Sequence, residues 1–117
     1  MLAAQDIDGQ STFGMSSKGG GSIALDIRDG GGVVRGVRGE GGVDLLHVNC
    51  EGCEWEMLEN IIKAGEHKHI RTIQFGSHYF PQVPGITGRY CRIRGELNKT
   101  HTMVYGQAWA WERWDRR

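Results

Sequence analysis

The clearest hydrophobic pattern along the chain predicts a β–α–β unit in its middle third. Residues 43–50 form an apolar run with glycines before it and an acid–glycine pair after it, which is typical of a buried parallel strand. Residues 52–64 repeat apolar positions with helical spacing, and residues 69–75 form a second apolar run. We therefore expect two adjacent parallel strands, with the helix crossing over between them in the right-handed sense.

The helix predicted at 52–64 carries a broad apolar stripe. Three side chains of this stripe are expected to be largely buried: Trp55, Leu58 and Ile62. Three others are expected to be exposed: Glu56, Glu59 and Lys63. Acidic side chains near the start and a lysine near the end suit the helix macrodipole, and Gly65 is a favourable stop.

The C-terminal third predicts a loop, a helix and a final strand region. Residues 76–86 are expected to form the loop, since they contain both prolines of the chain. Residues 87–99 have helical periodicity, and residues 102–114 return to the period of a strand, in which Trp109 and Trp111 alternate with alanines. We expect these last elements to form an antiparallel edge whose tryptophans fill the sheet face.

The first 42 residues have a weaker pattern. They hold 12 of the 19 glycines, and glycine loses more backbone entropy on ordering than any other residue. Alternation predicts a half-buried strand at 22–28, and the valines of residues 33–37 predict a further short strand between glycine breaks. We therefore divide the chain into a glycine-rich N-terminal segment, residues 1–42, and a C-terminal unit, residues 43–117.

Composition and charge bear on the partners of the protein. The 14 basic and 14 acidic side chains give no formal net charge, whereas nucleic-acid-binding proteins usually carry a basic excess. The sequence has no run of about 18 apolar residues, and residues 1–10 lack the features of a secretory signal. We therefore expect neither nucleic acid nor a membrane as a partner, and we leave the compartment unassigned beyond a cytoplasm-like cysteine usage.

The cysteines are three in number: Cys50, Cys53 and Cys91. An odd count argues against a disulfide framework and favours a reducing compartment. Cys50 and Cys53 have the spacing of half a zinc site, but a structural zinc ion normally takes four ligands. Because a strand end and a helix start should point the two thiols in different directions, we interpret them as small, partly buried thiols. A zinc-binding module and a redox-active pair are the alternatives.

Polar side chains gather where the two predicted parallel strands end. Asn49 lies at the end of the first strand, Glu51 follows it, and His78 follows the second strand. Ligands of open α/β sheets bind outside the carboxyl ends of the strands, so these three side chains should face one crevice. The alternative is structural: Glu51 and Glu54 favour the helix start, Asn49 holds the turn, and His78 packs in a loop.

The segment from Val43 to Leu58 resembles the signature of FkbM-type methyltransferases. That signature is an apolar strand, then a turn containing Glu-Gly-x-Glu, then a helix with a leucine three or four residues on. The following strand, His78 and the aromatic ending from Trp109 to Trp114 also resemble the family. The resemblance is good over residues 43–80 and thinner over the later part of the chain.

The resemblance implies an α/β fold, namely part of a Rossmann-like, mostly parallel sheet with flanking helices and an antiparallel C-terminal edge. It implies transfer of a methyl group from S-adenosylmethionine, commonly to a hydroxyl oxygen of a small-molecule or glycan-like acceptor. Asn49, Glu51 and Gly52 would then bind the cofactor. Glu51 and His78 would be catalytic, with His78 as the candidate base. No metal site is implied.

Some features depart from the family. Its usual acid after the strand is Asn49 here, which can form hydrogen bonds but cannot act as a carboxylate base, and its usual lysine is His47. The strand, glycine-rich loop and acid-ending strand that begin the family fold are not recognised before residue 22. We therefore expect the C-terminal half of a methyltransferase domain, with an unpaired strand edge open to self-association. The alternative is an inactive remnant or interaction domain that keeps part of the fold.

Overall fold

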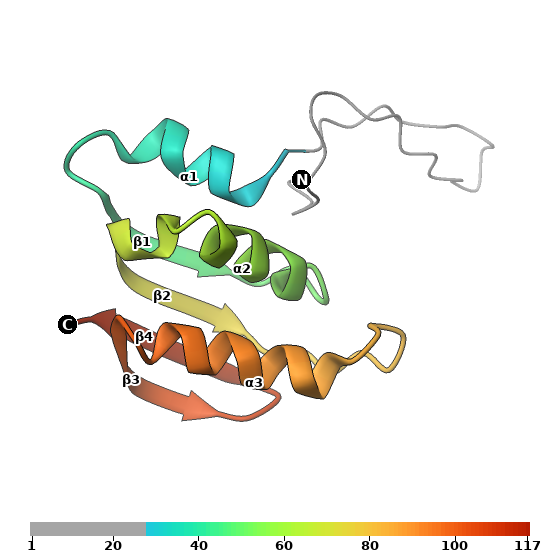
Figure 1. Cartoon of the computed structure of the whole chain (residues 1–117). Coiled ribbons are helices and arrows are strands. Elements are labelled where there is room, and N and C mark those ends of the chain that lie inside the picture. Colours follow the sequence, from blue (N-terminus) through green and yellow to red (C-terminus); the bar gives the residue numbers. More distant parts are fainter. Residues whose placement is uncertain (1–27) are drawn as a thin grey trace.

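The computed structural model describes residues 28–117, and this part of the chain forms a mixed α/β structure around one four-stranded sheet (Figure 1). The elements are α1 (Gly30–Arg38), β1 (Val43–Val48), α2 (Glu54–Lys63), the 3-10 helix η1 (Glu66–His69), β2 (Ile70–Gly76), α3 (Ile86–Leu97), β3 (His101–Gln107) and β4 (Trp111–Arg116). Apart from Arg28, the strand predicted at 22–28 lies outside the described residues. No helix between residues 28 and 117 has the length and hydrophobicity needed to cross a membrane.

The strands lie in the order β1-β2-β4-β3. β1 and β2 pair in parallel, from Val43 opposite Ile70 to Val48 opposite Phe75. β4 pairs antiparallel with both β2 and β3, so β1, β2 and β3 all run in one direction and the last strand is inserted in reverse. The predicted parallel pair with a helix between its strands is thereby confirmed, as is an antiparallel C-terminal part of the sheet. The expectation of a mostly parallel sheet is wrong for the described residues, because β4 lies between β2 and β3 and pairs antiparallel with both.

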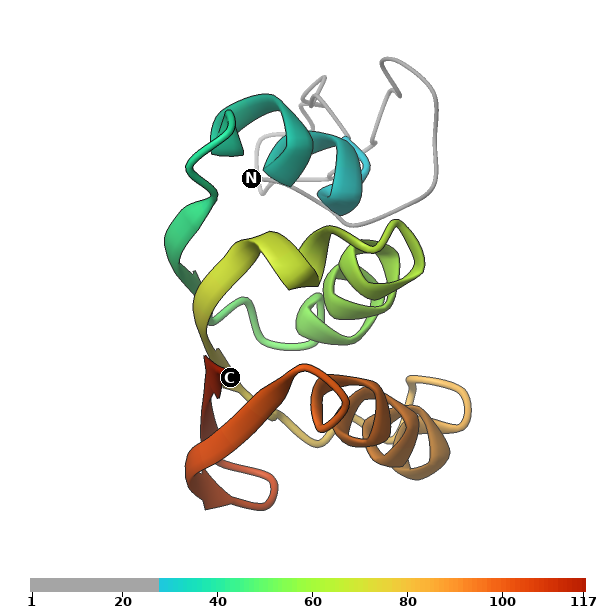
Figure 2. The same ribbon diagram turned by 60° about the vertical axis from the view of Figure 1, so that its left-hand side comes forward.

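The hydrophobic core lies between the sheet and the helices α2 and α3, which cover the same face of the sheet (Figure 2). The strands contribute the buried side chains of Val48, Ile70, Ile73, Phe75 and Trp114. The helices contribute those of Trp55, Leu58, Ile61, Tyr90, Ile93 and Leu97. The last three repeat with helical spacing along α3, which confirms the helix predicted at 87–99 to within two residues at each end.

The buried stripe of α2 is confirmed in part. Two residues of the predicted stripe are fully buried: Trp55 and Leu58. Ile61 completes the row at 0% exposure, whereas the predicted Ile62 is only half-buried. Glu59 is also half-buried rather than exposed, because it accepts a hydrogen bond from Arg89 Nε of α3 at 2.9 Å. This bond joins the outer sides of the two helices that cover the sheet.

The strand predicted at 33–37 is wrong, since these residues belong to the helix α1. The carboxylate of Asp29 caps this helix by accepting from the backbone N–H groups of Gly31 at 3.3 Å and Gly32 at 3.2 Å. The glycines that suggested chain breaks instead let α1 approach α2, because a Cβ added at Gly31 would lie 2.5 Å from the Cβ of Ala64. Close packing of the two helices here outweighs the low helix propensity of glycine.

The strand region predicted at 102–114 forms two antiparallel strands, and a turn at residues 108–110 that was not predicted joins β3 to β4. Trp109 lies in that turn with a φ of 60°, and not on the sheet face. Its ring contacts those of Tyr79 and Tyr90 at centroid distances of 5.0 and 4.8 Å. The reversal therefore carries this tryptophan toward the aromatic residues of α3 and the loop before it.

Two histidines are buried near the amino end of β2. His101 Nε2 lies 2.8 Å from the carbonyl oxygen of Ile70, and the ring of His67 stacks on that of His101 with centroids 6.4 Å apart. Burial lowers the pKa of both side chains from the usual value of 6.5. Both imidazoles are therefore neutral in the folded protein at neutral pH.

The first prediction concerns the core. Leu58→Ala removes a fully buried side chain between α2 and the sheet, so we expect the free energy of unfolding to fall by about 2–5 kcal/mol in urea titrations. The exposed Glu56→Ala on the same helix is the control and should change it by less than about 0.5 kcal/mol. A loss below about 1 kcal/mol for Leu58→Ala would mean that this face of α2 is not a core face.

The second prediction concerns pH. Unfolded histidines bind protons at the usual pKa of 6.5, but the buried pair binds them only at lower pH, so the unfolded state takes up more protons below that value. We therefore expect the free energy of unfolding to be constant above pH 7 and to fall between pH 6.5 and 5. His67→Gln should flatten this fall, and the exposed His69→Gln should not. Equal profiles for the two variants would contradict the assignment.

Candidate functional site

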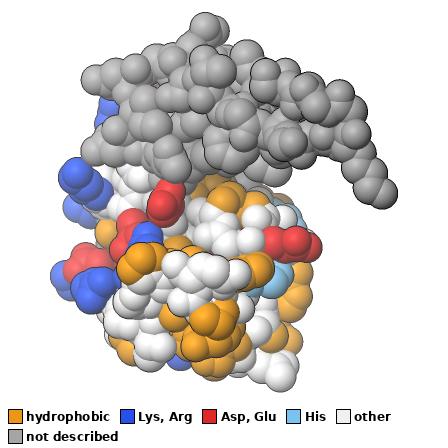
Figure 3. Space-filling model, turned by 90° about the vertical axis from the view of Figure 1, so that its right-hand side faces the viewer, with side chains coloured by type: hydrophobic (Ala, Val, Ile, Leu, Met, Phe, Trp, Pro, Cys, Tyr) orange, Lys and Arg blue, Asp and Glu red, His pale blue; other side chains and the backbone are white. Residues whose placement is uncertain are grey.

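The residues singled out from the sequence lie at one end of the sheet, where β1 and β2 finish. The parallel pairing sets Val48 opposite Phe75, so the loops that follow the two strands leave the sheet side by side. Asn49 begins the first loop and His78 lies in the second. Figure 3 looks onto this end and shows acidic and histidine side chains beside hydrophobic ones. The shared edge predicted for these groups is therefore present.

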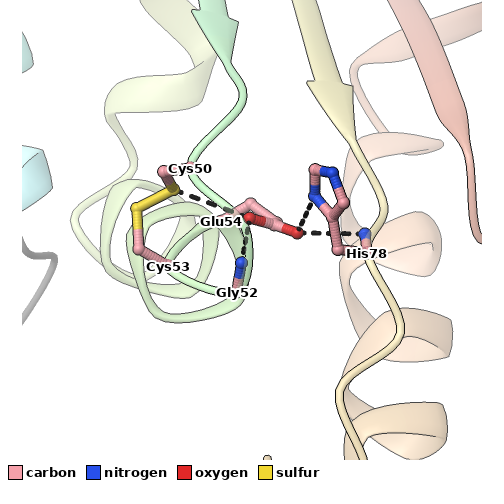
Figure 4. Close-up of a disulfide and its surroundings, with 5 residues drawn as sticks. All are labelled: Cys50, Gly52, Cys53, Glu54 and His78. Carbon is pink, nitrogen blue, oxygen red and sulfur yellow. Dashed lines mark hydrogen bonds and ion pairs between the residues drawn. A yellow bond between two sulfur atoms is a disulfide. The ribbon is translucent and has the colours of Figure 1, made fainter.

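Glu54 is the centre of this site, although its side chain is completely buried. Its Oε2 accepts a hydrogen bond from the backbone N–H of Gly52 at 2.9 Å. Its Oε1 accepts one from the backbone N–H of His78 at 3.0 Å and lies 2.9 Å from Nδ1 of the same residue (Figure 4). The carboxylate thus joins the loop after β1 to the loop after β2, and a buried charge needs such donors.

This contact favours one tautomer of the His78 ring. An ionised carboxylate can only accept, so the imidazole nitrogen that faces it carries the hydrogen. In the neutral ring the other nitrogen, Nε2, then has a free lone pair. The side chain is 33% exposed, which leaves it within reach of a ligand. Such an oriented, partly exposed imidazole can take a proton from a bound hydroxyl group.

Gly76 makes room for this arrangement at the end of β2. A Cβ at this position would lie 2.8 Å from Cε1 of His78 and 3.2 Å from Oδ1 of Asn49. The bare backbone therefore lets the imidazole and the amide oxygen lie over it. Gly52 has a similar role in the other loop, because its φ of 117° is open to glycine and a Cβ there would lie 3.3 Å from the ring of Phe80.

Glu51, predicted as a catalytic and cofactor-binding residue, has a different place from Glu54. It is exposed, with a φ of 53°, and lies on the surface of the turn rather than in the buried cluster. Asn49, Gly52 and His78 do contribute to the site around Glu54. From its position in the sequence, Glu54 is expected only to favour the helix start. Its position as the second acid of the Glu-Gly-x-Glu turn was the sequence feature that could have pointed to it. The spacing of the two acids alone does not determine which of them is buried.

The prediction that Cys50 and Cys53 point apart is wrong, because the two form a disulfide with their Cα atoms 5.4 Å apart. The reason is the turn between them, where Glu51 and Gly52 both have positive φ and bring the chain back on itself. Cys91 on α3 is the free, exposed cysteine. Between residues 28 and 117 no three His, Cys, Asp or Glu residues are grouped so that they could hold a metal ion, which gives the zinc alternative no ligand set there.

A second fully buried carboxylate, that of Glu112 on β4, provides a comparison for Glu54. Its oxygens accept from the hydroxyl group of Tyr90, from Arg94 Nε at 2.9 Å and from Trp114 Nε1 at 2.9 Å. Burial, together with the bond to Glu112, raises the pKa of Tyr90. Two of its donors, Tyr90 and Trp114, are buried core side chains, so we assign Glu112 to stability. Glu54 differs in the kind of partner it has, because an imidazole can accept and release a proton near neutral pH whereas the guanidinium of Arg94 cannot.

Aromatic side chains support the loop that carries His78. The indole Nε1 of the buried Trp55 donates to the carbonyl oxygen of His78 at 3.1 Å. Tyr79 and Trp109 pack edge to face and are 55% and 37% exposed. They therefore form a partly exposed aromatic border beside the loop that carries His78.

No protein-family model, no curated protein and no solved structure matches the chain. The function therefore has to be argued from the geometry of the site and from the sequence motif.

The third prediction tests the packing of the site. Gly76→Ala places a methyl group against the His78 ring, so we expect the ring to leave Glu54 and the free energy of unfolding to fall by about 1–3 kcal/mol. Nuclear magnetic resonance of the histidine ring protons should show the His78 signal displaced. Gly95→Ala in α3 is the matched control, because a Cβ there meets nothing within 4 Å and should stabilise the helix by up to about 1 kcal/mol. An unchanged His78 signal in Gly76→Ala would contradict the described arrangement.

Proposed function

We propose that this chain contributes the candidate base and part of the cofactor contacts of an S-adenosylmethionine-dependent methyltransferase site of the FkbM type. The observation that carries the proposal is the His78–Glu54 pair at the carboxyl edge of two parallel strands, with Asn49 beside it. Ligands of open α/β sheets bind at this edge. The motif that led to the family resemblance is the same turn that supplies Glu54 and the backbone N–H of Gly52.

His78 would act as the general base. A hydroxyl oxygen that attacks a methyl carbon must lose its proton, and Nε2 of His78 can accept it. The ring then becomes positively charged, and the buried Glu54 at 2.9 Å from Nδ1 stabilises that charge. The partly exposed ring and its aromatic border suit an acceptor that has both an apolar body and a hydroxyl group.

Asn49 and Glu51 would serve the cofactor. When bound, S-adenosylmethionine supplies the methyl group from a positively charged sulfonium. Carboxylate and amide oxygens suit such a cation, and both Asn49 and Glu51 are exposed at the edge where the strands end. The oxygens of Glu54 are already occupied by donors of the protein, so this residue would orient His78 and would not contact the cofactor.

The directions and connections of the strands also support the proposal. Three strands run in one direction, helices connect them over one face, and the last strand is reversed. A partial Rossmann-like sheet with an antiparallel C-terminal edge would have this arrangement. It would also leave the outer edge of β1 unpaired, as it is among the described residues.

The second candidate is an interaction domain without catalysis. Hydrophobic side chains on β1 and β3 are exposed: Leu45 at 54%, Val104 at 57% and Tyr105 at 54%. Together with the unpaired edge of β1, they favour association with another chain or a second copy. An interaction domain would need neither Asn49 nor His78, so ligand binding at those residues separates the two candidates.

The fourth prediction is a titration with S-adenosylmethionine followed by amide and histidine resonances. Because the residues of the proposed site lie at an open edge of the sheet, we expect binding weaker than about 100 µM. The shifted signals should be those of Asn49, Glu51, Gly52 and His78. Asn49→Asp adds a carboxylate beside the cation and should tighten binding about two- to fivefold.

The matched control is Asn98→Asp, which adds the same charge at the exposed end of α3, away from the site. It should leave the binding constant unchanged. If millimolar cofactor shifted no signal at these residues, or shifted signals elsewhere only, the methyltransferase proposal would be overturned in favour of the interaction domain. Low-micromolar binding would show that other residues hold the cofactor.

A further inference from the structure

A disulfide lies directly against the buried carboxylate that orients His78. Cys50 follows β1 and Cys53 is the residue before α2, so the cross-link closes the turn that supplies Gly52 to Glu54. We infer that the Cys50–Cys53 disulfide is a reducible two-electron switch that controls how Glu54 holds His78. The inference goes beyond the proposed function and needs neither the cofactor nor an acceptor.

The disulfide and the His78 ring both contact the carboxylate of Glu54. Cys50 Sγ lies 3.5 Å from Oε2 of Glu54, while Oε1 of the same group holds the His78 ring at 2.9 Å (Figure 4). A disulfide sulfur has no hydrogen to donate, whereas a thiol does. Reduction would therefore give Oε2 a new donor and change the charge that Oε1 presents to the imidazole.

The chemistry is thiol–disulfide exchange with a dithiol. Both cysteines are half-buried, so a small reductant can reach them. A thiolate of the dithiol attacks Cys50 Sγ, the disulfide bond breaks, and Cys53 leaves as a thiolate at the N-terminal end of α2, where the helix dipole favours negative charge. The second thiol of the dithiol closes its own ring and releases Cys50. The dithiol loses two electrons and two protons, and the two cysteines gain them.

The turn itself would also respond. Between the cysteines, Glu51 has a φ of 53°, which side chains other than glycine rarely adopt. The disulfide helps to hold this conformation, together with the hydrogen bond from Gly52 to Glu54. Without the cross-link the turn has fewer restraints, and the position of the carboxylate depends more on its hydrogen bonds.

The first test is alkylation with iodoacetamide and mass spectrometry on the folded chain. Before reduction we expect one labelled cysteine, the exposed Cys91. After mild treatment with dithiothreitol, without denaturant, we expect three. Labelling of Cys50 and Cys53 before reduction, or their resistance to dithiothreitol in the folded state, would overturn the inference.

The second test measures the equilibrium in glutathione redox buffers, in a Cys91→Ser background. Glu54→Gln replaces a charged acceptor with a neutral one, so the Cys50 thiol loses part of its stabilisation. We expect the equilibrium constant for reduction to fall about fivefold. Glu56→Gln removes a charge from the same helix turn at an exposed position and should leave the constant unchanged. Equal constants for the two variants would overturn the role of Glu54.

A third measurement needs no change at Glu54 and so stands even if Glu54→Gln fails to fold. The His78 ring signal of the Cys91→Ser protein should move when dithiothreitol is added, and the signals of His69 and His101 should stay in place. A Cys50→Ser/Cys53→Ser double variant should show no movement. A His78 signal that ignores reduction would refute the coupling, whatever the outcome of the cofactor titration.

Discussion

The buried charge of Glu54 constrains the rest of the site. A carboxylate in the interior is tolerated only where donors surround it, and those of Glu54 are the N–H of Gly52 and the N–H and ring of His78. These donors belong to the loops after β1 and β2. The two strands must therefore end side by side, and α2 must begin after only a short turn from the end of β1.

The same constraint explains why glycines occur at particular positions around the site. Gly52 has a φ that favours glycine and directs its N–H to the carboxylate. Gly76 lies in β2 and needs no special backbone conformation. Its lack of a side chain leaves space for the ring of His78 and the amide of Asn49. Glycine serves a third purpose in α1, where Gly31 allows two helices to meet. One residue type thus has three physical roles, and its frequency alone does not distinguish them.

The elements that could be predicted are those whose side chains repeat with the period of their backbone. The β1–α2–β2 unit and α3 have such repeats, because one face of each is buried. The helix α1 could not be predicted in this way, since tertiary contact with Ala64 decides it and the local propensity of glycine opposes it. The turn at Trp109 was missed for a related reason. Its alternation with alanines imitates a strand, but a positive φ reverses the chain there.

The sequence indicated the position of the candidate site in the fold more accurately than it indicated which residues form it. Asn49, Gly52 and His78 follow from the rule that loops after parallel strands share an edge. The choice between Glu51 and Glu54 depends on the dihedral angles of a four-residue turn, and so does the meeting of Cys50 with Cys53. Hydrophobic periodicity carries no information on such angles.

The two acids with no exposed surface, Glu54 and Glu112, connect different parts of the described structure. Glu112 joins β4 to α3 through Tyr90 and Arg94, which fixes the helix that follows the His78 loop. Glu54 joins the two loops and, through His78, the solvent-facing edge. A change at Glu112 must therefore pass through the packed core before it reaches His78, whereas a change in the 50–53 turn reaches the imidazole through a single carboxylate. That short path makes the turn, and not the core, the part of the fold where the chemical state of the surroundings can act on the site.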